Sequence, residues 1–411
     1  MKSFAEVEKA VNSYAMSLDR SSSYSLERII TLMEALGNPQ EKFKTVHIAG
    51  TSGKTSTSYY TAAMLEKAGY KVGLSVSPYV NDMNERVQIG TEPLPETLFC
   101  QEFSQFFEIL NKLSIRPTYF ELFVSFAYWY FAKAGVEYAV MEVGLGGLLD
   151  GTNVIRREDK VCIITDIGLD HISVLGGTIK EVAAQKAGII QPHNHVFIYR
   201  QSSEIDTQIQ ARAREKHAII HYADAKPAQE CLQRRNWNLA QTACEYILDR
   251  DGKERPASEA WLQTAYITIP GRQETLKYKE KTIILDGAHN AQKTDFLVES
   301  FRARYPDESP AVLLAIGANK DIHVQGMAQS LGILANFTII TTFSKGGDTP
   351  YPSIDPEEIA KYFDEQCVTV GPDLQRAIEA LLAREEKILL VTGSLYLVGA
   401  VKKLLKDIFL E

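Results

Sequence analysis

The stretch that decides the fold is "KTVHIAGTSGKTSTSYY", residues 44–60. An apolar run leads into a turn with two glycines, and a pattern typical of a helix follows. A lysine directly after a glycine, between a strand and a helix, is the arrangement in which backbone N–H groups and a helix N-terminus hold a phosphate. Gly50 lies closer to the Gly53-Lys54-Thr55 run than the strict G-x-x-x-x-G-K-[ST] pattern requires. The stretch predicts a phosphate-binding loop, with an ordinary glycine-rich turn as the alternative.

Strands and helices alternate on both sides of this loop. The first 45 residues are expected to be helical, and apolar runs that end in Gly, Ser or Asp follow. Alternation of this kind predicts an α/β domain with a mainly parallel sheet and helices on both faces. Ligand groups should therefore lie at the carboxyl ends of the strands. We expect strands over 45–50, 71–77, 137–146 and 161–170, and helices over 25–37, 55–69 and 118–135.

A second alternating region begins after "IPGRQE". It predicts a smaller Rossmann-like α/β domain, and the two domains are placed at residues 1–269 and 270–411. Its expected strands are 281–290, 311–318, 337–343 and 387–394, with helices over 356–366 and 373–387. Residues 196–265 carry the weakest signal, and there we expect helices over 204–218 and 236–250 and a surface loop over 249–260.

The net charge, the cysteine pattern and the length of the apolar runs exclude several classes of protein. A net charge of −8 argues against a general nucleic-acid binder, which would carry a basic surplus. The five cysteines are scattered, with no C-x-x-C pair and no metal spacing, which fits a reducing cytosol. No apolar run approaches 18 residues, so no membrane-spanning helix is predicted. We expect a soluble cytoplasmic protein that binds small molecules, without nucleic-acid or membrane partners.

Polar side chains follow several of the predicted strands. Ser77 ends one strand, Glu142 lies inside an apolar run, and Asp166, Asp170 and His171 follow another. A buried acid is costly unless it is paired or bound to a metal. Glu142 therefore either pairs with a basic side chain or holds a Mg²⁺ ion that bridges to nucleotide phosphates. His is an unusual Mg²⁺ ligand, so chemistry alone leaves the role of His171 open.

Other candidates are individually weak. Lys186 comes just before a helix-ending glycine, where a solvent-exposed lysine is the usual interpretation. In the second domain, Arg272 lies at the junction and is suited to binding a phosphate. Asp286 and His289 end one strand and Ser394 ends another. Together these residues predict a second strand-end site.

Several sequence segments, in the order in which they occur, resemble those of the folylpolyglutamate synthase/dihydrofolate synthase family, which belongs to the Mur ligases. They run from residue 24 to 401 and cover most of the chain. The segments that carry the resemblance are "YSLERI", "LGNPQ", "FKTVHIAGTSGKTS", "GYKVGLSVSPYVNDMNERVQI", "TYFE", "YAVMEVGLGGLLDGTNVI", "TDIGLDHISVLGGTIKEVAAQKAGII", "PGRQE", "ILDGAHN" and "VTGSLYLVGAV".

The resemblance implies roles that spacing does not show. The implied catalytic residues are Lys54, His171, Lys186 and Arg272, with Lys186 carbamylated to help position a second metal ion. The implied ATP-binding residues are Thr51, Ser52, Gly53, Lys54, Thr55, Asn238 (adenine), Arg272, Asp286 and His289. The implied Mg²⁺ ligands are Ser77, Glu142 and His171. The implied pterin pocket comprises Thr118, Tyr119, Phe120, Leu149, Asp150 and Gly151.

The activity that the resemblance implies is ATP-dependent ligation in a monomer. ATP would phosphorylate a carboxylate of a reduced folate or of dihydropteroate, and the amine of L-glutamate would attack the acyl phosphate. Closure of the second domain would exclude water from that intermediate. Two other functions stay open: a Mur-type ligase that acts on a non-folate carboxylate, and a P-loop ATPase switch without ligation.

The chain departs from the family pattern at four places. Ser52 and Thr55 replace the Asn and Gly of "GTNGKGS", and Thr55 restores a hydroxyl directly after the lysine. Leu148 and Gly151 replace the Arg and Ala of "GGRLDATN". "SPYV" replaces "SPHL". The stretch before Asn238 is short, and we expect no clear β-rich segment there. These changes affect the expected acceptor more than the expected ATP and metal roles.

Overall fold

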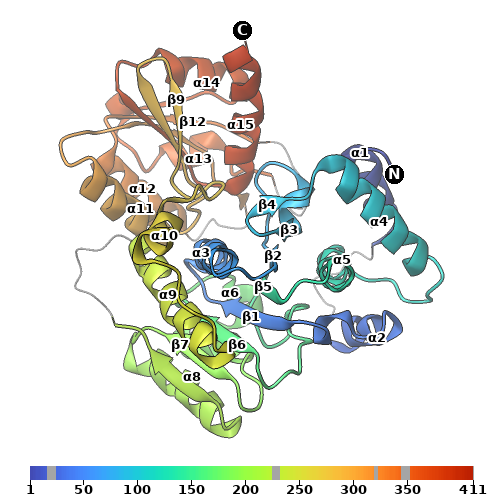
Figure 1. Ribbon diagram of the computed structural model, residues 1–411. Coiled ribbons are helices and arrows are strands. Elements are labelled where there is room, and N and C mark those ends of the chain that lie inside the picture. Colours follow the sequence, from blue (N-terminus) through green and yellow to red (C-terminus); the bar gives the residue numbers. More distant parts are fainter. Residues whose placement is uncertain (16–24, 225–231, 319–322, 344–351, 411) are drawn as a thin grey trace. The chain divides into compact units, whose positions relative to one another are not determined.

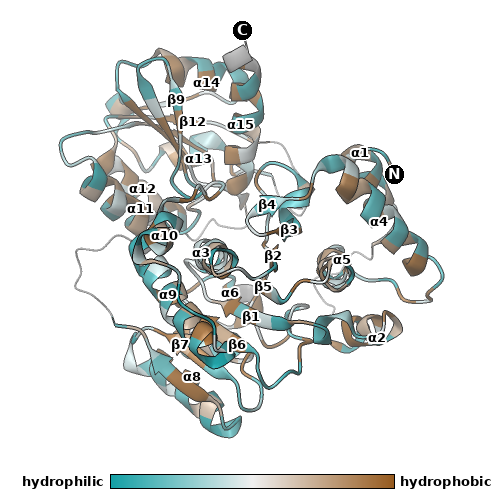
Figure 2. Ribbon diagram, viewed as in Figure 1, coloured by the Kyte–Doolittle hydropathy of each residue, from teal (hydrophilic) through white to brown (hydrophobic). Residues whose placement is uncertain are grey.

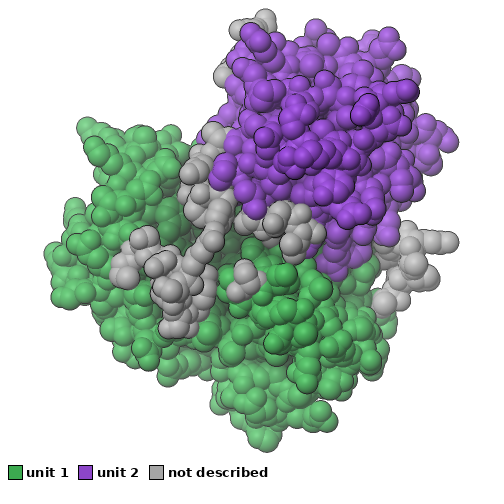
Figure 3. Space-filling view, turned by 180° about the vertical axis from the view of Figure 1, so that it is seen from behind, with its two compact units in different colours: residues 1–267 green, residues 268–411 purple. Residues whose placement is uncertain are grey.

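The computed structural model describes residues 1–15, 25–224, 232–318, 323–343 and 352–410 (Figure 1). The chain divides into two compact units, unit 1 over residues 1–267 and unit 2 over residues 268–411 (Figure 3). The division falls two residues before the boundary that the sequence predicts.

Unit 1 is an α/β unit. Its strands are β1 (Lys44–Ala49), β2 (Val72–Ser75), β3 (Gln88–Ile89), β4 (Glu92–Pro93), β5 (Tyr138–Glu142), β6 (Val161–Ile164), β7 (His195–Ile198) and β8 (Ile219–Tyr222). Its helices are α1 (Phe4–Tyr14), α2 (Glu27–Ala35), α3 (Lys54–Lys67), α4 (Glu96–Leu110), α5 (Tyr119–Ala134), α6 (Ile172–Leu175), α7 (Ile179–Ala187), α8 (Ser203–Glu215), α9 (Leu232–Asp251) and α10 (Ser258–Gln263).

The eight strands form one sheet in the order β4-β3-β2-β5-β1-β6-β7-β8. All neighbours from β2 to β8 are parallel, and only the two-residue strands β3 and β4 pair antiparallel. The predicted mainly parallel sheet is confirmed. Because β2, β5, β1 and β6 are adjacent, the residues that follow these four strands meet at one edge of the sheet.

Two sets of packing contacts form the core of unit 1, one around α3 and one between α4 and α5. Helix α3 is buried along nearly its whole length, because it lies between the sheet and α9. Figure 2 shows the apolar residues of β6 and β7 close to α9, whose own residues are largely hydrophilic. A second cluster is aromatic and packs α4 against α5, with close ring pairs among Phe99, Phe103, Phe106 and Phe126.

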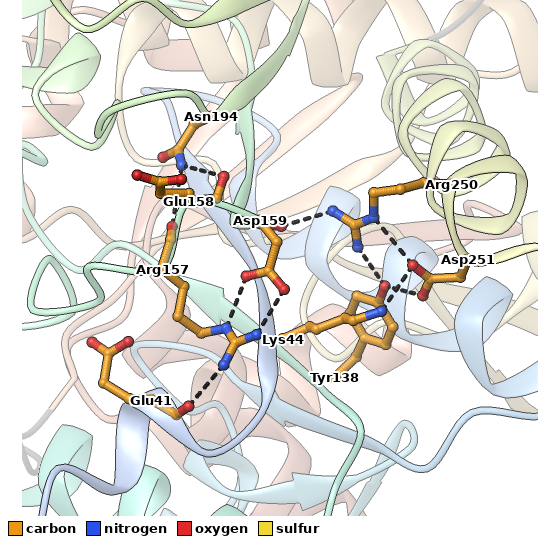
Figure 4. A network of polar contacts seen from close by, with 9 residues as sticks. All are labelled: Glu41, Lys44, Tyr138, Arg157, Glu158, Asp159, Asn194, Arg250 and Asp251. Atoms are coloured by element: carbon orange, nitrogen blue, oxygen red, sulfur yellow. Dashed lines mark hydrogen bonds and ion pairs between the residues drawn. The ribbon is translucent and has the colours of Figure 1, made fainter.

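A polar network fixes the C-terminal end of α9 at the start of β1 (Figure 4). The Asp251 carboxylate accepts hydrogen bonds from Lys44 Nζ at 2.8 Å, Tyr70 Oη at 3.0 Å, Tyr138 Oη at 2.5 Å and Arg250 Nε at 3.1 Å. This end of α9 is thus held at the amino edge of the sheet, opposite the phosphate loop.

Unit 2 is a smaller α/β unit whose sheet has the order β13-β12-β11-β14-β10-β9. All pairs are parallel except β9 with β10. Its strands are β9 (Glu274–Tyr278), β10 (Lys281–Leu285), β11 (Ala311–Leu314), β12 (Phe337–Ile340), β13 (Val368–Val370) and β14 (Ile388–Thr392). Its helices are α11 (Ala291–Arg304), α12 (Val324–Leu334), α13 (Pro356–Ala360), α14 (Leu374–Ala383) and α15 (Leu395–Leu410).

Three local expectations were wrong. A strand, β8, lies before Asn238 where no β segment was expected, and it is the edge strand of the first sheet. The expected loop over 249–260 is shorter, because α9 continues to Asp251 and α10 begins at Ser258. The helix expected over 356–366 ends at Ala360, and a 3-10 turn follows over Glu365–Cys367.

The described residues also bear on membrane-spanning helices and on the state of the cysteines. No helix among the described residues is long and apolar enough to cross a membrane. The described cysteines, Cys100, Cys162, Cys244 and Cys367, are all free thiols, and Cys231 lies outside the described residues.

Candidate active site

The phosphate loop follows β1 and requires glycine at two positions. A Cβ atom on Gly50 would lie 1.8 Å from Thr165 Oγ1, so no side chain fits there. Gly53 has φ of +90° and directly precedes α3, which begins at Lys54. That backbone conformation favours glycine. The loop therefore turns sharply from the end of β1 into the N-terminus of a helix, as an anion-binding site requires.

The loop is tied to the end of β6. Thr51 N and Ser52 N donate hydrogen bonds to the backbone oxygen of Asp166, at 2.8 and 3.2 Å. The Thr51 hydroxyl donates to Gly168 O at 2.9 Å. Burial raises the pKa of the Asp166 carboxyl, and the guanidinium of Arg235 on α9, 2.9 Å away, opposes that shift. One aspartate thus joins the loop, β6 and α9.

Two lysines converge on the loop. Lys54 Nζ donates to Gly50 O at 3.0 Å, and Lys186 Nζ donates to the same oxygen at 2.8 Å. Lys186 is only 4% exposed. The interpretation of Lys186 as a solvent-exposed lysine before a helix end is therefore wrong, because α7 packs its last turn against the loop that contains Gly147.

Glu142 connects two of the neighbouring strand ends. Its carboxylate is buried at the end of β5 and accepts hydrogen bonds from Thr55 Oγ1 at 2.9 Å and from Ser77 N at 3.2 Å. Thr55 belongs to the first turn of α3, and Ser77 follows β2. The structure thus brings together three residues that the sequence places far apart.

This donor set suits Mg²⁺. Carboxylate and hydroxyl oxygens from Glu142, Thr55 and Ser77 are the ligands that this ion prefers. Within the described residues, no group of three or more His, Cys, Asp or Glu side chains could hold a metal ion by itself. A site with one carboxylate is typical of Mg²⁺ that is bound mainly by nucleotide phosphates.

His171 lies after β6, at the N-terminus of the four-residue helix α6. Its backbone is left-handed, with φ of +51°, and its side chain is 41% exposed. Its Nε2 atom is 3.8 Å from the buried Asp170 carboxylate. The structure places His171 at the same sheet edge as the loop, and its role as a metal ligand stays a prediction.

Helix α9 contributes residues that the sequence did not single out. Arg235 binds Asp166, and the next residue, Asn236, is buried against Gly53. Asn238, the predicted adenine ligand, is half-buried on the same helix. Local sequence carries no signal for the contact between α9 and the loop, because nearly two hundred residues separate them.

Some of the residues predicted for the acceptor site lie close together in the structure. Thr118 begins α5 with a capping box: its hydroxyl accepts from Glu121 N, and the Glu121 carboxylate accepts from Thr118 N. The ring of Phe120 lies over two glycines, since a Cβ on Gly144 would lie 2.5 Å from it and a Cβ on Gly151 3.5 Å. Phe120 and Gly151 therefore lie together, and their role in binding an acceptor stays a prediction.

Tyr119 belongs to a buried cation site. The guanidinium carbon of Arg86 lies 5.5 Å from the ring centroids of Tyr79 and Tyr119 and 5.1 Å from that of Phe123. Arg86 is buried, so these rings replace water around its charge. Arg86 was not among the residues predicted from the sequence, although the "NERV" that contains it directly follows "SPYVNDM".

Asp150 holds the loop that carries Leu149. The buried carboxylate accepts hydrogen bonds from Leu145 N at 2.7 Å and Thr152 N at 3.0 Å. Burial raises the pKa of Asp150, and these hydrogen bonds oppose that shift. Leu148 and Leu149 are 37% and 41% exposed. Asp150 therefore shapes the loop, and the leucines are the side chains that the loop presents.

Unit 2 has its own strand-end cluster. The buried Asp286 carboxylate, after β10, accepts hydrogen bonds from Gln273 N at 2.9 Å and Ala288 N at 2.8 Å. Burial raises the pKa of Asp286, and the charge of Arg272 opposes that shift. Arg272 Nη1 donates to Gly271 O at 3.0 Å. Arg272 and Asp286 thus lie in one local site.

His289 completes this cluster. Its Nδ1 atom is 2.8 Å from Gly287 O, and its Nε2 atom is 2.9 Å from Lys293 Nζ. An ammonium group can only donate, so we assign Nε2 as the acceptor and Nδ1–H as the donor to Gly287. His289 is therefore in its neutral form in this arrangement.

Comparison with known proteins gives the family. Residues 116–254 match the Mur ligase middle domain, and residues 271–395 match the Mur ligase glutamate ligase domain. A Bacillus subtilis protein named "Dihydrofolate synthase/folylpolyglutamate synthase" is 31% identical over 420 residues, which cover 93% of this chain and 95% of that protein. The chain belongs to the folylpolyglutamate synthase/dihydrofolate synthase family. It is therefore a Mur-type, ATP-dependent ligase.

Solved structures of this family share the fold. The Mycobacterium tuberculosis folylpolyglutamate synthase complexed with ADP and AMPPCP has a TM-score of 0.83 at 24% identity, covering 98% of both chains. The Escherichia coli FolC protein in complex with DHPP and ADP also has a TM-score of 0.83 at 24% identity, covering 99% of this chain and 98% of that one. The predicted Mur-ligase architecture is confirmed.

Proposed function

We propose that this ligase joins L-glutamate to the carboxylate of a folate-type acceptor, either a reduced folate or dihydropteroate. The observation that carries the proposal is the convergence of Lys54, Lys186 and Glu142 around the phosphate loop at one sheet edge. The names of the Bacillus subtilis relative and the DHPP bound to the Escherichia coli protein support the choice of acceptor.

The proposed chemistry has two steps. A carboxylate oxygen of the acceptor attacks the γ-phosphorus of ATP, which forms an acyl phosphate and releases ADP. The amine of glutamate then attacks the acyl carbon, and a tetrahedral intermediate expels inorganic phosphate as a proton leaves the nitrogen. Lys54 and Arg272 offset the negative charge on the transferring phosphoryl group.

We propose that Ser77, Glu142 and His171 hold Mg²⁺, and that a carbamylated Lys186 helps to position a second ion. The ion would supply Lewis-acid polarisation of the phosphoryl oxygens. The buried Glu142 carboxylate supports this assignment, because it accepts a hydrogen bond from the hydroxyl of Thr55 in the first turn of α3.

For the nucleotide, we propose that Thr51, Ser52 and Gly53 hold phosphates through the loop and that Asn238 contacts adenine. Support comes from the loop geometry and from the position of Asn238 on α9, the helix that packs on α3. In unit 2, Arg272 is proposed to bind phosphate, and Asp286 and His289 to bind the ribose side of ATP.

For the acceptor, we propose that the pterin ring lies against Phe120. The proximity of the Phe120 ring to Gly144 and Gly151, where no side chain intervenes, supports this role. The other proposed lining residues are Thr118, Tyr119, Leu149 and Asp150.

Incorporation of labelled glutamate tests the function. The protein, ATP and Mg²⁺ are incubated with dihydropteroate or with tetrahydrofolate, and the Lys54→Ala variant serves as the inactive control. ATP-dependent incorporation with either pterin supports the proposal and tells which acceptor is used. Absence of incorporation with both, while ATP is still bound, would refute it.

One observation favours a second candidate, a Mur-type ligase for a non-folate carboxylate. Leu148 presents an apolar side chain where the family pattern has Arg. Incorporation of glutamate into cell-wall nucleotide precursors, but not into pterins, would identify this function. Phosphate release without any acceptor would instead indicate an ATPase switch.

We also propose that the enzyme acts as a monomer in the cytosol. The free thiols of the described cysteines support a reducing compartment. Size-exclusion chromatography with light scattering tests the oligomeric state.

A further inference from the structure

Four of the chain's eight histidines lie on strands β7 and β8 or in the turns that lead into them. His195 begins β7, and His221 lies on β8, the edge strand of the first sheet. In the register of these strands His221 pairs with Phe197, two residues after His195, so the three rings lie on one face of the sheet. Helix α9 packs on this face, because the ring of Tyr246 on α9 stacks on that of His195 with centroids 4.3 Å apart.

The two imidazole rings on this face share a proton. His195 Nδ1 is 2.8 Å from His221 Nε2, so one ring donates a hydrogen bond and the other accepts it. Burial lowers the pKa of both rings, and both are therefore neutral near pH 7. Neutral imidazole is the form that binds a metal ion. The shared proton thus occupies a place that a cation can take.

The distance between the two nitrogen atoms is close to the one that a shared metal ion needs. Two imidazole ligands of a tetrahedral Zn²⁺ ion, each about 2.0 Å from it, are about 3.3 Å apart, so the rings would have to separate by about half an ångström. Among the described residues no third His, Cys, Asp or Glu joins the pair, and both rings are half-buried, so water supplies the remaining ligands. The charge of Arg250, which acts on His195, is offset by the Asp251 carboxylate, 3.1 Å from Arg250 Nε.

We propose that His195 and His221 form a binding site for a divalent transition-metal ion of the Zn²⁺ and Ni²⁺ class. The shared proton moves to the far nitrogen of its own ring through exchange with water, and the two facing nitrogens give their lone pairs to the ion. Imidazole nitrogen selects such ions over Mg²⁺, which prefers oxygen ligands. A bound ion would join the edge strand β8 to β7 and so stabilise this side of unit 1.

Titration calorimetry with Zn²⁺ and with Ni²⁺ tests the site. The nucleotide-free protein is titrated in a large excess of Mg²⁺, so that sites made of oxygen ligands are already occupied. His195→Phe and His221→Phe each remove one ligand and keep an aromatic ring to stack on Tyr246 and Phe197. We expect each variant to bind both ions about tenfold or more weakly than the wild type, because even the loss of an outer-shell partner costs this much.

His217→Phe is the matched control. His217 is an exposed histidine in the turn before β8, and its ring stacks on that of His193 with centroids 6.1 Å apart. This variant should bind Zn²⁺ and Ni²⁺ with wild-type affinity. In thermal unfolding, Zn²⁺ should raise the unfolding temperature of the wild type and of the control, but not that of either variant of the pair.

Two results would overturn the proposal. One is wild-type affinity for both ions in a folded His195→Phe or His221→Phe protein. The other is a loss of affinity in His217→Phe as large as in the variants of the pair, which would place the bound ion on the exposed histidines instead.

Discussion

Lys54 and Lys186 donate hydrogen bonds to one and the same atom, the backbone oxygen of Gly50, at 3.0 and 2.8 Å. One lysine begins α3 and the other lies in the last turn of α7, so two helices place positive groups on the same carbonyl. Two ammonium groups this close repel each other and favour an anion beside them. Carbamylation of Lys186 would replace this repulsion with attraction, because it converts a positive group into a negative one.

Replacing Lys186 should therefore abolish ligation. We expect Lys186→Ala to lower kcat by about a hundredfold or more, because it removes a buried charged group from the reacting site. Lys180 is an exposed lysine on the same helix, so Lys180→Ala is the control and should leave kcat unchanged. Steady-state rates of glutamate incorporation measure both, and equal rates for the two variants would contradict the assignment.

Carbamylation makes its own prediction. Activity should fall when bicarbonate and dissolved carbon dioxide are removed and should return when bicarbonate is added. Lys186→Ala should show no response to bicarbonate. A wild-type enzyme that is indifferent to bicarbonate, with an unmodified Lys186 by mass spectrometry, would refute the carbamate.

Comparing Gly53→Ala with Gly37→Ala should distinguish the effect of backbone strain from the loss of ADP binding. The new methyl group would meet Asn236, and φ is +90° there. Gly37 has a similar φ of +77°, but nothing lies within 4 Å of a Cβ built on it. We expect about 1 kcal/mol of strain from either substitution. Only Gly53→Ala should also lose ADP affinity in calorimetry, and equal ADP affinity in the two variants would contradict this.

Asp251 should make the stability of unit 1 depend on acidic pH. Burial alone would raise its pKa, but hydrogen bonds from Lys44, Tyr138 and Arg250 outweigh burial and lower the pKa to about 2. The unfolded value is close to 4, so the folded state favours the ionised form. The resulting stabilisation is complete above about pH 4 and is lost as pH falls through 2.

Asp251→Asn should cost up to about 2 kcal/mol at pH 7 and flatten the pH dependence below pH 4. Asp249→Asn is the control, because Asp249 makes an exposed ion pair with Arg255. Urea unfolding at pH 7 and pH 3 gives both free energies. A variant at Asp251 that loses no more stability than the control would show that the network contributes little.

Asp150→Asn should weaken the acceptor site while leaving nucleotide binding intact. An amide offers one oxygen where the carboxylate offers two, so the hydrogen bond from Leu145 N or those from Thr152 must be lost. The loop that carries Leu149 would then loosen. We expect KM for the pterin to rise about tenfold, with ADP affinity unchanged. An unchanged KM would place Asp150 outside the acceptor site.

Much of the fold could be read from local patterns. Gly50, Gly53 and Lys54 marked the β1–α3 loop because glycine and lysine have distinct chemistry there, and the alternation of elements predicted a parallel sheet. The strand order β2-β5-β1-β6 could not be read, because it depends on packing between distant segments. That order is what brings Ser77, Glu142 and Thr55 together.

The features that were not predicted from the sequence, or were predicted wrongly, also have physical explanations. Lys186 looked exposed because its neighbours resemble an ordinary helix end, whereas its burial comes from the loop around Gly147. Asn236 and Arg86 were missed because their surroundings come from other elements. Strand β9 had a usable signal in the alternating "ETLKY" before the "KE" turn, and a hairpin with β10 could have been predicted.

Helix α9 is fixed at Asp251 by the polar network, and near its other end Asn236 lies against Gly53 of the phosphate loop and Arg235 binds Asp166. Its 20 residues span about 30 Å. We therefore expect a natural variant that disturbs Asp251 or Arg250 to shift the first turns of the same helix. Clinical or evolutionary surveys of this family should count such variants among those that change cofactor affinity, and not only among those that lower expression.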